Sequence, residues 1–147
     1  MNQIFETVND PAFLILRVVV GGMIFAHGAH KLLGWFGGYG FKGTMGFLTG
    51  TAKLPYVIAL LVIVIEFFGG LGLIVGLGVR VAAAGVIAVM IGAAITAHRS
   101  HGFFMNWSGA QKGEGYEFHL IVIAAATALL LRGGGAWALD SLITANL

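Results

Sequence analysis

The chain contains no cysteine and few charged residues. Among its 147 residues, Asp, Glu, Lys and Arg together make up 10%, whereas an average soluble domain has about 25%. Without cysteine, this chain alone cannot build a disulfide relay, an iron–sulfur cluster or a thiol nucleophile. The formal net charge is only +2, and the sequence has no basic stripe, so nucleic acid is not an expected partner.

Long apolar runs make up most of the sequence. Hydrophobic residues make up 59% of the chain, and a membrane-spanning helix needs about 20 mostly apolar residues. The runs are continuous rather than alternating, which favours helices over a β-barrel. We therefore predict an all-α polytopic membrane four-helix bundle, forming a single domain over residues 1–147. Its predicted spans are 13–33, 54–77, 79–97 and 118–131.

Local signals predict how these helices begin and connect. Asp10-Pro11 is typical of a helix start, with Asp as the N-cap and Pro in the first position. The first ten residues contain no Lys or Arg, so we expect no secretory signal. Residues 76–80 predict a tight turn between the second and third spans. Residues 34–51 are rich in glycine and aromatics, which predicts an interfacial loop or a re-entrant segment.

All five histidines are expected at one end of the bundle. His27 and His30 close the first span, His98 and His101 close the third, and His119 opens the fourth. Both long loops, 34–51 and 99–115, lie at this end, so we predict that it is the working face. More Lys and Arg residues also lie there, which favours a cytoplasmic orientation for the histidine end.

The histidines leave more than one kind of site open. Histidine titrates near neutral pH and binds metals, so the cluster indicates proton or redox chemistry. The paired spacing could suit a transition metal or a haem, but the Glu-x-x-His pattern of di-iron bundles is absent. We favour two other interpretations over a metal or haem: histidines that bind loop backbone, or a site for a quinone-type headgroup. No metal ligand is therefore assigned.

Glu66 lies midway along the second predicted span, where a carboxylate is costly and normally has a partner or a polar cavity. We expect Arg17, in the first span, to pair with it. The pair would either hold two helices in register or tune a carboxylate that accepts protons or binds a headgroup. At the opposite interface, Asp140 is expected to pair with Arg80 or Arg132.

Polar residues near the histidines extend this predicted site. His27 and Lys31 are four residues apart and so share a helix face. Glu117 opens the fourth span, where an acidic residue complements the helix dipole. Alternatively, Glu117, Asn106 and His98 meet at the mouth of the bundle.

Several of these residues together resemble the DoxX family of small DoxX/DoxD-like membrane proteins. The resemblance covers residues 11 to 142 and rests on five ordered pieces: Arg17…His27-Gly28-x-x-Lys31, Glu66-x-x-Gly69-Gly70, Gly76-x-Gly78-x-Arg80, Gly115-x-Glu117 and Leu139-Asp140. It implies a four-helix protein of the bacterial or archaeal inner membrane. The family takes its name from a subunit associated with a terminal quinol oxidase.

Other family members resemble the membrane subunit of thiosulfate:quinone oxidoreductase, or are linked to complexes of superoxide and thiol redox defence. Some wider relatives use cysteines for disulfide transfer, a route closed to this chain. The resemblance therefore implies binding of a quinone or another cofactor, with other redox-complex subunits and the lipid bilayer as partners.

The leading hypothesis is a quinone- or quinol-binding subunit of a membrane redox complex. Whether the chain is itself an oxidoreductase is left open. The isoprenoid tail is expected among Phe25, Phe67 and Phe68. The residues expected to exchange protons are Glu66, His27 and Glu117, and those expected to hold the headgroup are Arg17, His27, Lys31, His98 and Asn106.

Two alternatives carry no redox chemistry. The chain could be a scaffold or anchor that holds redox partners through the aromatic side chains of its loops. It could also be a small transporter, which four helices would form only as a homo-oligomer.

Overall fold

The computed structural model describes residues 2–145, and this part of the chain is helical without strands. The all-α prediction is thus confirmed. The α-helices are α1 (Pro11–Leu32), α2 (Gly40–Gly46), α3 (Tyr56–Val64), α4 (Gly70–Val75), α5 (Val79–Ala93), α6 (Glu117–Arg132) and α7 (Asp140–Ala145). Three π-helical turns continue them: η3 (Phe47–Thr51), η4 (Ile65–Gly69) and η5 (Ala94–His98).

Within residues 2–145, three helices are long and apolar enough to cross a membrane: Pro11–Leu32, Tyr56–Val75 and Val79–His101. The protein is therefore a multi-pass membrane protein, and the first three predicted spans match these helices to within a few residues. The fourth predicted span corresponds to α6, which has 16 residues. That is shorter than the roughly 20 that a perpendicular crossing needs, so the fourth crossing stays a prediction.

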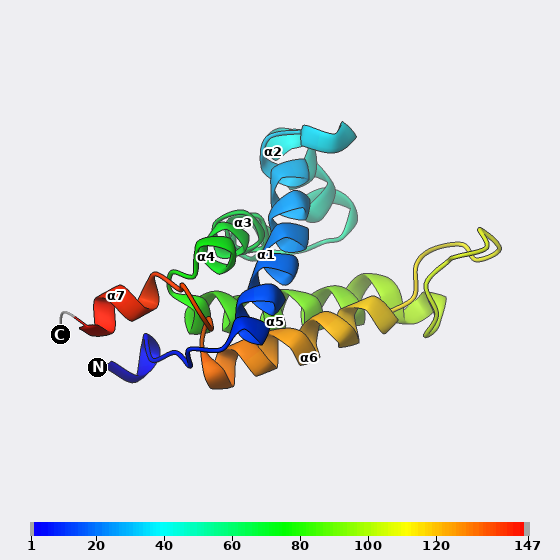
Figure 1. Ribbon diagram of the computed structural model, residues 1–147. Helices are drawn as coiled ribbons and strands as arrows, with labels where there is room; N and C mark the ends of the chain where they lie inside the picture. The colour runs from blue at the N-terminus through cyan, green and yellow to red at the C-terminus, as the bar shows by residue number, and fades with distance from the viewer. Residues whose placement is uncertain (1, 146–147) are drawn as a thin grey trace.

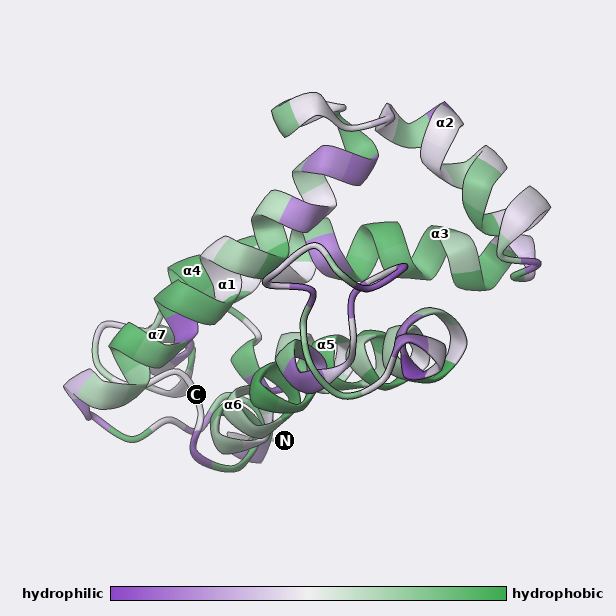
Figure 2. Ribbon diagram, turned by 90° about the vertical axis from the view of Figure 1, so that its right-hand side faces the viewer, coloured by the Kyte–Doolittle hydropathy of each residue, from purple (hydrophilic) through white to green (hydrophobic). Residues whose placement is uncertain are grey.

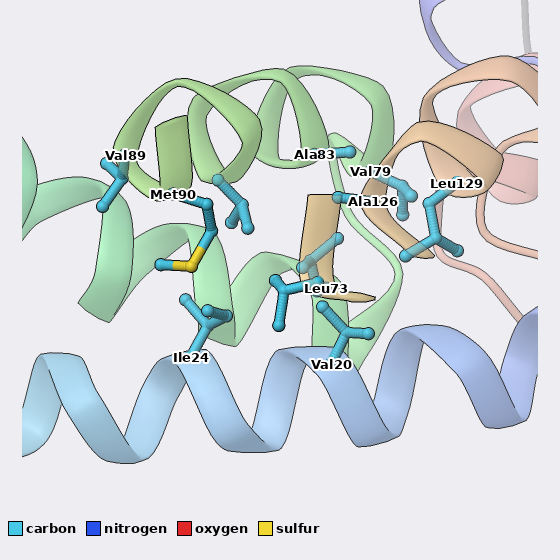
Figure 3. Close-up of a cluster of buried hydrophobic side chains, with 11 residues drawn as sticks. Val20, Ile24, Leu73, Val79, Ala83, Val89, Met90, Ala126 and Leu129 are labelled. Carbon is cyan, nitrogen blue, oxygen red and sulfur yellow. The ribbon is translucent and has the colours of Figure 1, made fainter. Parts of the chain in front are cut away.

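The helices pack in two pairs that cross each other. Figure 1 shows α1 upright beside α3 and α4, while α5 and α6 run side by side across the view. Figure 2 shows that the long helices are mainly hydrophobic and that hydrophilic segments gather in the loop between α5 and α6. The crossing is filled by a buried cluster to which α1, α4, α5 and α6 contribute (Figure 3), including Val20, Ile24, Leu73, Val79, Ala83, Met90, Ala126 and Leu129.

The predicted helix start and tight turn are both confirmed. The Asp10 side chain accepts a hydrogen bond from the amide of Ala12 at 2.8 Å, and Pro11 opens α1. Gly76 and Gly78 have φ angles of 76° and 62°, a left-handed backbone that glycine adopts without steric cost. They end α4 and turn the chain directly into α5.

One local prediction is narrowed and one is wrong. Residues 34–51 are largely helical, with α2 and η3 over 40–51, so of the two predicted forms the re-entrant segment, rather than an irregular loop, stays a prediction. Asp140 pairs with neither Arg80 nor Arg132 and instead accepts hydrogen bonds from the amides of Gly78 and Val79, at 2.6 and 3.0 Å. It thus caps the first turn of α5, where a negative charge is favoured by the helix dipole.

Candidate functional site

A buried ion pair joins α1 to the middle of the second span. The ammonium of Lys31 donates to a carboxylate oxygen of Glu66. The Glu66 side chain is 5% exposed and that of Lys31 is 23% exposed. A lysine carries three donors, so the partly exposed ammonium keeps donor capacity for a further oxygen acceptor.

Glycines at the helix contact determine which residues meet. A Cβ on Gly28 would lie 2.5 Å from the Cα of Phe67, closer than real Cβ atoms approach. A Cβ on Gly70 would lie equally close to the amide nitrogen of Phe25. Because small residues let helices approach closely in lipid, α1 lies directly against the π-helical turn that carries Glu66. Lys31, one turn after Gly28, is thereby brought to the carboxylate.

The predicted pair between Arg17 and Glu66 is wrong. The Arg17 guanidinium is buried and donates to backbone carbonyls of Leu73, Ile74, Gly134, Ala136 and Trp137. It joins the end of α4 to the segment before α7, at the end of the molecule where both chain termini lie (Figure 1). Arg17 is thus a structural residue of the far end, and its expected part in a headgroup site is not carried forward.

Three of the five histidines form a linked group beside the ion pair. The His98 and His119 rings lie 4.2 Å apart between centroids. His119 also interacts electrostatically with His27, and His27 with Lys31 and Glu66. The His27 ring lies 6.4 Å from that of Phe118, so side chains at the start of α6 reach across to α1.

The members of this group differ in exposure. His27 is exposed, His98 is half-buried and His119 is buried. The Nδ1 atom of His98 lies 2.9 Å from the carbonyl oxygen of Glu114. A carbonyl only accepts hydrogen bonds, so Nδ1 of His98 carries the hydrogen. The buried Nδ1 atom of His119 has no hydrogen-bond partner among residues 2–145.

The remaining two histidines have other neighbours, although His30 also interacts electrostatically with His27. His30 packs edge-on against Tyr39, with ring centroids 6.4 Å apart. His101 lies in the loop after η5, against Gly113. Within the described part of the chain, no three His, Cys, Asp or Glu side chains gather closely enough to hold a metal ion.

Glu117 and Asn106 are engaged within the loop that connects η5 to α6. The Glu117 carboxylate accepts from the amide of Met105 at 3.1 Å and from the indole of Trp107 at 3.0 Å. The Asn106 side chain makes two hydrogen bonds with the backbone of Gln111. These contacts fold the loop back on the first turn of α6, and His98 reaches the same loop through Glu114.

The aromatic residues expected around the tail do cluster. The Phe25 and Phe67 rings lie 5.2 Å apart, and the Phe67 and Phe68 rings 5.0 Å apart. However, two residues along a helix rotate a side chain by about 200°, so Phe25 and His27 point to opposite flanks of α1. Met23 lies one turn before His27 on the same face and is 39% exposed. The tail site at these rings stays a prediction.

Comparisons with known proteins agree with the family that the residues indicated. The DoxX family model matches residues 12–99. A Bacillus subtilis (strain 168) protein named "Putative oxidoreductase CatD" is 30% identical over 143 residues, covering 97% of this chain and 92% of that protein. No solved structure matches the chain.

Proposed function

This chain belongs to the DoxX family, and on that premise we propose that it is a membrane subunit of a redox complex that binds a quinone or quinol. The single observation that carries the proposal is the ion pair between Lys31 and Glu66. Charged groups within a membrane span are costly, and they commonly mark a substrate or proton pathway. The similarity to a protein named as an oxidoreductase supports redox chemistry for this chain.

The residues around the pair fit a quinone headgroup. A quinone presents two carbonyl oxygens, and Lys31 and His27 offer N–H donors from one face of α1. Lys31 keeps part of its surface accessible, and His27 is exposed. The tail would then follow the flank of α1 that carries Met23, and from there enter the lipid.

The acidic member of the pair is the proton-exchanging group of this proposal. When bound, a quinone supplies the redox chemistry by accepting two electrons and two protons per molecule, with the electrons coming from a redox partner subunit. Glu66 accepts and returns protons beside the headgroup, and Lys31 holds the carboxylate in place. Glu117 already binds the loop through two donors, so we assign proton exchange to Glu66. The site belongs to the inner membrane of a bacterial or archaeal cell.

Equilibrium binding of decylubiquinone to the protein in lipid nanodiscs tests the proposal. We expect Lys31→Met to raise the dissociation constant about tenfold or more, because hydrogen bonds to charged groups contribute about 1.5–3 kcal/mol. Glu66→Gln should do the same, because it removes the carboxylate that holds the Lys31 ammonium in place. Glu6→Gln and Lys42→Met are matched controls, since both residues are exposed and distant in sequence from the pair. Unchanged affinity in folded Glu66→Gln protein would contradict the proposal.

A scaffold role is the second candidate, and exposed loop aromatics favour it. The side chains of Phe104 and Trp107 are 66% and 85% exposed, which is unusual for aromatic residues with no partner to cover them. If the chain only anchors redox partners, Trp107→Ala abolishes co-purification of a partner subunit from the native membrane. Glu66→Gln would then leave that association unchanged.

A further inference from the structure

His119 combines burial, an unpartnered nitrogen and two histidine neighbours. Its side chain is 5% exposed, and its Nδ1 atom has no hydrogen-bond partner in the described chain. An unsatisfied buried polar atom costs about 1–3 kcal/mol. A phenylalanine of similar shape would fill this position without that cost. His101 also has an unpartnered Nδ1 atom, but the ring of His119 additionally lies against that of His98, and this contact indicates a role for its nitrogen atoms.

The neighbours of His119 connect it on one side to the water-exposed loop and on the other side to the buried carboxylate of Glu66. From η5, the half-buried His98 lies against it with a tilted ring, and His98 is held by the exposed loop through Glu114. From α1, the exposed His27 interacts electrostatically with His119 and also with Lys31, Glu66 and His30, and its ring lies 6.4 Å from that of Phe118, the residue before His119. His98, His119 and His27 thus lead from the loop to Glu66 through three imidazoles on three helical segments.

We propose that His98, His119 and His27 form a proton path from the loop side of the protein to Glu66. This inference rests on the proposed function, because it names the route by which protons reach the quinone site. Only protons move along this path; the electrons for the quinone come from the redox partner subunit. Histidine suits this role because each ring binds a proton on one nitrogen and can release one from the other.

The steps balance without any further reactant. His98 holds its Nδ1 hydrogen on the Glu114 carbonyl, so its Nε2 atom accepts a proton from water. The proton passes to His119, whose unpartnered Nδ1 atom is available as an acceptor, with one bridging water where the rings do not touch directly. His119 passes a proton to His27, and His27 passes one to the Glu66 carboxylate. Each imidazole ends neutral, and one proton has moved from water to Glu66.

Time-resolved infrared spectroscopy of the purified protein after acidification tests the path without any quinone. The signal is the carboxyl band that Glu66→Gln removes. We expect His119→Phe to slow the appearance of this band about tenfold or more, because a positioned acid–base group typically contributes at least that much to proton transfer. Added imidazole should restore the rate. His101→Phe is the matched control, since it also removes a histidine with a buried, unpartnered Nδ1 atom.

Each outcome decides the proposal. An unchanged rate in His119→Phe overturns the path, as does the lack of any band that depends on Glu66. An equal slowing in His101→Phe also overturns it, because the effect would then reflect the loop rather than the path. Decylubiquinone affinity measured on the same samples reports on the proposed function separately: we expect His119→Phe to bind it as wild type does.

Discussion

Gly28 of α1 lies directly against the backbone of Phe67, and this contact places Lys31 beside Glu66. The site therefore depends on a residue without a side chain as much as on the charged pair. In the same antiparallel contact, Gly21 faces Leu73. Moving forward along α1 thus corresponds to moving back along the second span.

Gly28→Ala should separate the two helices at the site. The added methyl group meets backbone, which cannot move aside easily, and overpacking of this kind costs about 1–3 kcal/mol. Gly22→Ala is a control within the same helix, because nothing lies within 4 Å of a Cβ at that position. Since alanine favours helix over glycine, we expect no loss of stability there. Thermal unfolding in detergent measures both variants, and equal stabilities would contradict the described contact.

Arg17→Met should destabilise the protein strongly without acting on the histidine end. Its loss leaves several buried carbonyls unpaired, each at a cost of about 1–3 kcal/mol, so we expect at least about 3 kcal/mol in total. Arg17→Lys should recover little, because a compact ammonium cannot reach carbonyls on both sides as a guanidinium does. A stable Arg17→Met protein would show that these hydrogen bonds contribute little to the fold.

Asp140→Ala should loosen the turn between α4 and α5. The variant removes the acceptor for two amides of the α5 N-terminus, and losing a helix cap costs about 0.5–2 kcal/mol. Asp140→Asn keeps an acceptor oxygen, so it should retain part of this stability. Hydrogen exchange at Gly78 and Val79 measures the effect locally; exchange that stays as slow in Asp140→Ala as in wild type contradicts the capping role.

Glu117→Leu should release the loop that precedes α6. The carboxylate holds both the Met105 amide and the Trp107 indole, and a charged hydrogen bond contributes about 1.5–3 kcal/mol. We expect amide exchange at Met105 to rise about tenfold, with a change in Trp107 fluorescence. Glu6→Leu serves as the control at the other end of the molecule. If the Met105 amide exchanges alike in all three proteins, Glu117 does not hold the loop.

The positions of the helices could be predicted from the sequence, but the side chains that pair across helices could not. Continuous apolar runs indicate where helices lie, and Asp10, Gly76 and Gly78 mark helix ends, so the spans and the turn could be predicted from the sequence. The partner of Glu66 could not be predicted, because it depends on the relative register of two helices. Lys31 was correctly placed on a face with His27, but only the close contact of Gly28 with Phe67 shows that it, rather than Arg17, reaches Glu66.

The contacts among the histidines could not be predicted from the sequence either. Alternating helix directions indicate that all five lie at one end, but they do not indicate which rings meet: His98 lies against His119, whereas His30 lies against Tyr39. His30 and His101 lie instead close to Gly38 and Gly113 of the following loops. Side-chain direction at helix ends depends on how the following loop folds, which no periodic pattern in the sequence records.

Photoaffinity labelling with an azidoquinone in membranes, followed by peptide mapping, tests the central claim most directly. The account predicts label on the α1 segment from Met23 to Lys31 and at the start of α6 near Phe118, with loss of this label when unmodified quinone competes or Glu66 is replaced by Gln. Competable label at the opposite end, around Trp137 and Leu139, or label that Glu66→Gln leaves unchanged, would contradict it.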